Sequence, residues 1–330
     1  MSSLAKKSSW LSIVQDCDNF PYDRDAWKQY YRLFLEGDQQ PNGYILPEIM
    51  ARLPKVEGVS ISDEPTGRSY RVCEASANPK KDSKTTARAV NATFQRIADE
   101  CVEKDLFHCI GAQHSEPFAI PTAPYPVQIE RYAAALFGIT QRGAHLTATT
   151  RTSDGELRFW VPRRAEHLYT SPGKLDASVA GGIKASTTPL ETIIAEAGEE
   201  ASLPADLVRS RIRSAGALTY VSVTNENNFP GEKGLVIPDM IYAFDIELPA
   251  DVVPRPHDDE VKDFQLMGVA EVQERLLNRE FKPDAAMVYV DFFIRHGYIT
   301  AENEPHLAEI CTHLHRRLPF GCTPHRNDDT

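Results

Sequence analysis

The sequence lacks any apolar run long enough to cross a membrane. No stretch of 18 consecutive apolar residues occurs in the 330 residues, whereas a membrane-spanning helix needs about 20. The apolar segment that precedes Asp16 and Asp18 is too short for the core of a signal peptide, and arginine is missing from it, which disfavours a mitochondrial transit peptide. We therefore expect a cytoplasmic protein that does not bind membranes.

Basic runs and paired cysteines are also missing. The net charge is −11 and no long run of lysine and arginine occurs, so the chain repels polyanions and no nucleic-acid partner is expected. None of the six cysteines is spaced as C-x-x-C, which favours reduced, buried thiols over a disulfide framework or a zinc site. The content of 42% hydrophobic and 25% charged residues is typical of a folded globular protein.

The first 140 residues are predicted to form a mainly helical N-terminal domain. Apolar residues recur at helical spacing in Asp23–Leu35, and a second helix is expected over Lys84–Val102. A proline-rich loop then leads to a third helix over Val127–Phe137. No internal repeat is present, so the length predicts one large domain or two ordinary ones.

The pattern changes to strands after Gly143, which defines a second domain over residues 141–330. Ala144–Arg151 and Leu157–Pro162 are rich in β-branched and aromatic residues and flank an Asp-Gly turn, which predicts a β-hairpin. Further strands are expected at 177–180, 215–223, 235–248 and just after 256, with helices from 189 and over 269–277, 284–296 and 304–317. The chain is therefore predicted to be an α+β protein with a mixed sheet.

Three glutamates share one face of the helix that begins near Pro189. Glu196, Glu199 and Glu200 are spaced i, i+3 and i+4 in its last turns, where like charges repel and the helix dipole disfavours them. No lysine or arginine lies between Lys184 and Arg209. Such a face is either solvated or binds a cation, and oxygen ligands favour Mg²⁺ or Mn²⁺ over zinc.

The segment from Gly181 to Leu203 resembles the Nudix box, G-x5-E-x7-R-E-U-x-E-E-x-G-U, where U is aliphatic. The positions that match are Gly181, Glu196, Ala197, Glu199, Glu200 and Leu203. The resemblance implies a Nudix α/β/α sandwich after the helical N-terminal domain. It also implies that the Gly181 carbonyl and the three glutamates hold metal ions that neutralise a diphosphate and position the attacking water.

Three positions depart from this motif. Thr187 occupies the motif position of the first glutamate, Ser202 that of the second glycine, and Ala195 that of the arginine. In the family, that arginine holds the catalytic glutamates in place through charge-assisted bonds. Ala195 therefore predicts an activity that is reduced, redirected or lost.

The resemblance extends over essentially the whole chain to one Nudix subgroup with a thiamine pyrophosphokinase-related N-terminal domain. The similar segments include Glu130–Arg131, Leu136–Gly138, His145–Ala148, Trp160–Arg164, Ser171–Gly173, Leu175–Asp176, Val179–Gly182, Asp258–Val261 and Phe281–Pro283. Members of this subgroup hydrolyse thiamine diphosphate and its oxidised analogues to the monophosphates, and the resemblance implies the same substrates here.

Other residues are candidates for the same site. Glu260, in an acidic loop, is the expected general base or additional metal ligand beside the catalytic Glu199 and Glu200. Arg163 and Arg164 are candidates to bind phosphate oxygens. Lys174 and Asp176 are candidates to face the substrate. Surface roles remain open for all four residues.

Two other functions remain open. The same fold could act on another diphosphate, such as an isoprenoid or nucleoside diphosphate. Loss of the motif arginine also fits a protein that binds a ligand without hydrolysis, or one that catalyses non-hydrolytic chemistry such as isomerisation. The sequence does not predict the oligomeric state.

Overall fold

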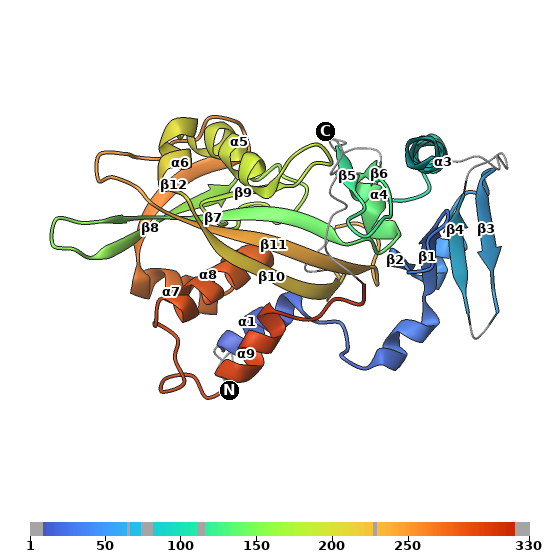
Figure 1. Cartoon of the computed structure of the whole chain (residues 1–330). Coiled ribbons are helices and arrows are strands. Elements are labelled where there is room, and N and C mark those ends of the chain that lie inside the picture. The colour runs from blue at the N-terminus through green and yellow to red at the C-terminus, as the bar shows by residue number, and fades with distance from the viewer. Residues whose placement is uncertain (1–8, 65–66, 74–81, 111–115, 227–229, 321–330) are drawn as a thin grey trace.

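The computed structural model describes residues 9–64, 67–73, 82–110, 116–226 and 230–320. The chain forms two sheets of four and six strands and a two-stranded β5–β6 ribbon (Figure 1). Among the described residues, none of the helices combines the length and apolar character needed to cross a membrane.

The N-terminal region combines helices with a small sheet. Its elements are α1 (Trp10–Cys17), the 3-10 helix η1 (Arg24–Gln29), β1 (Tyr31–Leu35), β2 (Gly43–Ile45), α2 (Pro47–Met50), β3 (Val59–Ser62), β4 (Ser69–Val72), α3 (Ser83–Glu103), β5 (Pro117–Ala119), β6 (Gln128–Glu130) and α4 (Arg131–Leu136). The sheet order is β2-β1-β4-β3. The long helix α3 confirms the expected helix over residues 84–102, and its apolar side, which includes Val90, Phe94 and Ile97, is buried.

Two of the expected N-terminal helices are corrected by the structure. The residues of Asp23–Leu35 form η1 and then strand β1, because Leu33 and Leu35 are fully buried where β1 pairs with β2 and β4. Tertiary pairing here outweighs local helical spacing. The helix expected from Val127 starts only at Arg131, where the Glu130 carboxylate accepts a hydrogen bond from the Ala133 backbone N–H at 2.8 Å.

The second half is built on the larger sheet. Its elements are β7 (Gln141–Arg151), β8 (Leu157–Arg164), β9 (Val179–Gly182), α5 (Pro189–Ala201), α6 (Ala205–Arg211), β10 (Arg213–Val223), β11 (Val236–Glu247), β12 (Val261–Gly268), α7 (Val269–Leu277), α8 (Pro283–Arg295) and α9 (Leu307–Leu314). The order is β10-β11-β7-β8-β12, with β9 paired to β7. The β11–β7 pair is parallel and the other pairs are antiparallel, which confirms the predicted mixed sheet and the β7–β8 hairpin.

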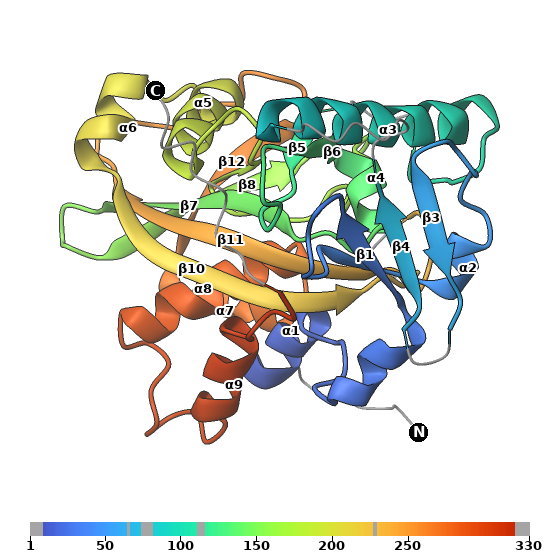
Figure 2. The ribbon, with the colours of Figure 1, turned by 45° about the vertical axis from the view of Figure 1, so that its right-hand side comes forward.

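Helices cover both faces of this sheet. Helices α5 and α6 lie on one face, and α1, α7, α8 and α9 lie on the other (Figures 1 and 2). One core packs Ile193 and Ala197 of α5 against Leu146 and Val179. The opposite core packs α8 residues such as Phe293 against the sheet. This arrangement is the predicted α/β/α sandwich.

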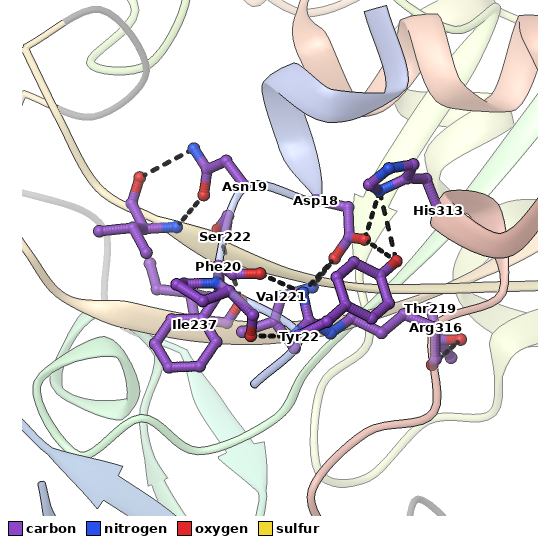
Figure 3. A network of polar contacts seen from close by, with 12 residues as sticks. Asp18, Asn19, Phe20, Tyr22, Thr219, Val221, Ser222, Ile237, His313 and Arg316 are labelled. Carbon is purple, nitrogen blue, oxygen red and sulfur yellow. Dashed lines mark hydrogen bonds and ion pairs between the residues drawn. The ribbon is translucent and has the colours of Figure 1, made fainter. Parts of the chain in front are cut away.

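The N-terminal helix α1 packs with the C-terminal helices rather than with the small sheet. It contacts α8 and α9, and the segment that follows it is tied to β10 and to the end of the chain by the network in Figure 3. The side chain of Asp18 is fully buried; it accepts hydrogen bonds from the Val221 backbone N–H and the Arg316 guanidinium, both at 3.0 Å. The domain boundary near residue 140 stays a prediction. Helix α1 precedes this boundary in the sequence but packs against helices that follow it.

Candidate active site

Helix α5 begins and ends as its sequence dictates. The Thr188 hydroxyl accepts a hydrogen bond from the Glu191 backbone N–H at 3.2 Å, the Glu191 carboxylate accepts one from the Thr188 backbone N–H at 3.0 Å, and Pro189 occupies the first turn. Ser202 ends the helix in the left-handed region with φ 53°, where the motif has glycine. Leu190, in the first turn of α5, is 41% exposed.

The carboxylates of α5 face a cavity of about 680 Å³ between the sheet, α5 and the N-terminal region. Six of the predicted site residues line it: Arg164, Gly181, Glu196, Glu199, Glu200 and Glu260. The N-terminal region contributes Glu116, Phe118, Arg131 and Tyr132. The cavity is therefore assembled from both halves of the chain.

Gly181 is required by the close approach of strand β9 to α5. A Cβ atom at this position would lie 2.3 Å from Oε1 of Glu196, so no larger residue fits without moving that carboxylate. The next turn is tied to the same strand, because the Ala180 backbone N–H donates to Oε2 of Glu200 at 3.0 Å. The motif glycine and two motif glutamates are thus held side by side.

Burial favours the protonated form of two of these carboxylates. Desolvation and then repulsion by Glu199 raise the pKa of Glu196 to about 7, and burial raises the pKa of Glu200 well above its ordinary value. Glu200 is 9% exposed, whereas Glu199 and Glu260 are exposed to the cavity. The site therefore has one buried carboxylate (Glu200), one that is half-buried (Glu196) and two that are exposed (Glu199 and Glu260).

The donor set suits a hard divalent cation. It consists of carboxylate oxygens and a backbone carbonyl, which are ligands that Mg²⁺ and Mn²⁺ prefer, and a bound cation would offset the repulsion that raises the pKa of Glu196. In the part of the chain that the structure describes, no three His, Cys, Asp or Glu side chains are already gathered closely enough to hold a metal ion. Binding therefore requires the carboxylates to draw together around the ion.

Cationic side chains that are not motif positions also line the cavity. Lys184 lies 2.7 Å from the Glu116 carboxylate and lowers the pKa of Glu196 through its charge. Arg131 lies 3.8 Å from the same carboxylate, and Arg142 is 7% exposed. The lining still carries eight carboxylates against five lysines and arginines, so a diphosphate needs added positive charge to enter.

The four predicted substrate-binding residues have different surroundings. Arg164 lines the cavity, but it forms a buried 2.8 Å ion pair with Asp176 and also donates to the Thr170 carbonyl at 3.0 Å. Arg163 donates to the Gly173 carbonyl at 2.9 Å and Lys174 to the Arg279 carbonyl at 2.7 Å. The surroundings of Arg163 and Lys174 favour structural roles, and the prediction that they bind substrate stays untested.

Several cavity residues were not predicted as site residues. Besides Lys184, Arg131 and Arg142, the cavity is lined by His145, Asp239, Lys282 and Asp284. They come from strands and a helix start distant in sequence, and no local spacing reveals that they meet. His145 and Lys282 did lie in segments that resemble the Nudix subgroup, which was the available signal.

The comparisons with known proteins agree with this architecture. The family model described as NUDIX domain matches residues 143–289. The uncharacterized protein YJR142W of Saccharomyces cerevisiae is 38% identical over 322 residues, which covers 94% of this chain and 92% of that protein. Nudix hydrolase 20, chloroplastic, of Arabidopsis thaliana is 32% identical over 186 residues, 56% of this chain and about half (47%) of that protein.

A solved structure was also compared. The crystal structure of DR0079 from Deinococcus radiodurans matches with 20% identity and a TM-score of 0.39, over 56% of this chain and 100% of that chain. The chain belongs to the same family as yeast YJR142W, and its residues 143–289 form a NUDIX domain.

Proposed function

We propose that this protein is a Mg²⁺- or Mn²⁺-dependent diphosphatase that converts thiamine diphosphate, or its oxidised analogues, to the monophosphate. The observation that carries the proposal is the meeting of Gly181, Glu196, Glu199 and Glu200 with Glu260 on one cavity wall. The substrate follows from the resemblance to the thiamine diphosphate subgroup.

The carboxylates of the cavity are assigned two roles, and Glu199 is a candidate for both. Glu196, Glu200, Glu199 and the Gly181 carbonyl would hold the divalent cation, which supplies positive charge to the diphosphate and lowers the pKa of bound water. Glu260 or Glu199, which are exposed to the cavity, would accept the proton of the attacking water.

The cations of the cavity are assigned to the phosphate groups. Arg142, Arg131 and Lys184 line the same space as the carboxylates and would bind phosphate oxygens through charge-assisted hydrogen bonds. Arg164 is held by Asp176, so we assign it to positioning the wall of the cavity.

A substrate panel tests the proposal. The purified protein is incubated with thiamine diphosphate, oxidised thiamine diphosphate, geranyl diphosphate and a nucleoside diphosphate, with Mg²⁺, Mn²⁺ or a chelator, and the products are identified by mass. We expect metal-dependent thiamine monophosphate. Turnover of geranyl diphosphate alone would move the substrate to the isoprenoid class. Absence of turnover in every arm would favour a ligand-binding protein, as Ala195 at the arginine position allows.

A further inference from the structure

A smaller chamber of about 200 Å³ adjoins the main cavity. The two spaces share lining residues, among them Arg131, Gln141, Asp239 and Lys282. The chamber therefore lies next to the cavity of the proposed diphosphate site.

The floor of the chamber is a row of polar side chains across three strands. Tyr220 of β10 is in register with Asp239 of β11, and Asp239 is in register with Gln141 of β7; all three line the chamber. The Tyr220 hydroxyl donates to the Asp239 carboxylate at 3.2 Å. This row presents one carboxylate flanked by a phenol and an amide.

The walls come from α1 and from the start of α8. Cys17 ends α1, and the start of α8 contributes Lys282 and Asp284, which form a 2.8 Å ion pair. Asp284 therefore has its own cation. Among the described residues Asp239 forms no ion pair, and its side-chain partner is the neutral Tyr220.

A polar atom without a partner lines the main cavity. It belongs to His145, which is 4% exposed, and burial lowers the pKa of this imidazole. Its Nδ1 atom is buried and has no hydrogen-bond partner within the described residues. A buried polar atom without a partner costs free energy, which a polar ligand or an ordered water removes.

We propose that this chamber binds the organic part of the diphosphate substrate, and that Asp239 selects a small ring that carries a positive charge or an amino group. The location of the phosphates in this proposal rests on the proposed function. An amino group on such a ring would donate to the Asp239 carboxylate, and a positive ring would add to the positive charge that Lys282 places near it.

The polarity of the chamber argues against an apolar group. Its lining includes the charged side chains of Asp239, Lys282 and Asp284. An apolar chain would also remove water from Asp239 without replacing its hydrogen bonds, which is unfavourable. Burial and the charge of Asp284 already raise the pKa of Asp239 to about 6, and a cation beside it would lower that pKa again.

The test uses thiamine, which carries an aminopyrimidine and a positive charge but no phosphate. Its affinity for the full-length protein is measured by calorimetry at pH 8 for the wild type, Asp239→Asn and Asp245→Asn. Asp245 lies on the same strand and pairs with Arg295 at 2.6 Å, so it controls for loss of a strand carboxylate outside the chamber. We expect Asp239→Asn to weaken thiamine binding roughly 10- to 100-fold, and Asp245→Asn to leave it unchanged.

The hydrolysis assay separates this inference from the proposed function. In Asp239→Asn, we expect kcat/KM to fall for thiamine diphosphate but not for geranyl diphosphate. If the wild type does not bind thiamine, or if Asp239→Asn binds it as tightly as the wild type, the inference is overturned even when hydrolysis is observed. If thiamine binding depends on Asp239 and no diphosphate is hydrolysed, the chamber assignment holds and the proposed function fails.

Discussion

At the scale of single residues, the carboxylates of α5 are held close together at an electrostatic cost. The raised pKa values of Glu196 and Glu200 mean that the folded, metal-free protein keeps protons that the unfolded chain releases. Their chemistry is therefore linked to both pH and metal ions.

This linkage predicts how the stability of the metal-free protein varies with pH. Glu196 titrates near its ordinary value of 4.5 when unfolded and at about 7 when folded, so the stabilisation that it contributes is present below pH 4.5 and is lost as the pH rises to 7. In chelator, we expect the free energy of unfolding to fall between pH 5 and pH 8 by on the order of 2 kcal/mol. Urea unfolding at each pH measures this free energy.

Two controls accompany this measurement. Glu196→Gln should reduce the dependence on pH, and Mn²⁺ added at pH 8 should restore stability by binding the ionised carboxylates. A metal-free protein that is as stable at pH 8 as at pH 5, with no effect of Mn²⁺, would contradict the pKa assignments.

Ala195 gives a second prediction at the residue scale. Its side chain is exposed on α5, one turn before Glu199, so an arginine there can pair with Glu199 in the i, i+4 relation. We expect Ala195→Arg to raise the rate of metal-dependent hydrolysis severalfold, whereas Ala195→Gln, which is long but uncharged, should not. An unchanged or lower rate in a well-folded Ala195→Arg protein would count against this role of the motif arginine.

At the scale of elements, the sequence predicted those whose signals are local. The Asp-Gly turn of the β7–β8 hairpin, the start of α5 at Pro189 and the helical spacing in α3 are each marked within a few residues, and the structure confirms them. Strand β1 was missed because its burial depends on β2 and β4, which are distant in sequence. The motif glutamates could likewise be identified locally, but Asp239, His145 and Arg142 could not.

The end of α4 meets strand β2 so closely that glycine is required at the contact. Gly138, after α4, has φ +58°, and a Cβ atom there would lie 2.2 Å from the Tyr44 carbonyl oxygen of β2. We expect Gly138→Ala to lower the free energy of unfolding by about 3 kcal/mol or more, because backbone must move. Gly155→Ala is the control, since φ is +86° and no atom lies within 4 Å; it should cost about 1 kcal/mol. A similar loss of unfolding free energy in both variants would contradict the close approach of Gly138 to Tyr44.

At the scale of the whole molecule, both ends of the described chain are fastened to the sheet beside the chamber. Asp18 binds Val221 of β10, Arg316 and His313, the last at 2.7 Å (Figure 3). Its neighbours Asp16 and Cys17 line the chamber. The Asp18 network therefore stabilises the fold and fixes one chamber wall.

Loss of this carboxylate should destabilise the whole protein. Asp18→Ala leaves the Arg316 guanidinium, 6% exposed, without its partner, and we expect a loss of about 3–5 kcal/mol. Asp16→Ala breaks a partly exposed pair with Arg279 and should cost less than about 1 kcal/mol. Urea unfolding of both variants measures the difference. Equal and small losses would show that the buried network contributes little.

The most direct test of the central claim, that the α5 carboxylates hold the metal of a diphosphatase, is a titration with Mn²⁺ followed by electron paramagnetic resonance. The wild type is compared with Glu200→Gln and with Glu271→Gln, whose carboxylate pairs with Arg275 on α7. We predict that the wild type and Glu271→Gln bind Mn²⁺ with similar affinity and that Glu200→Gln loses at least tenfold in affinity. Equal binding by all three proteins, or none by the wild type, would contradict the claim.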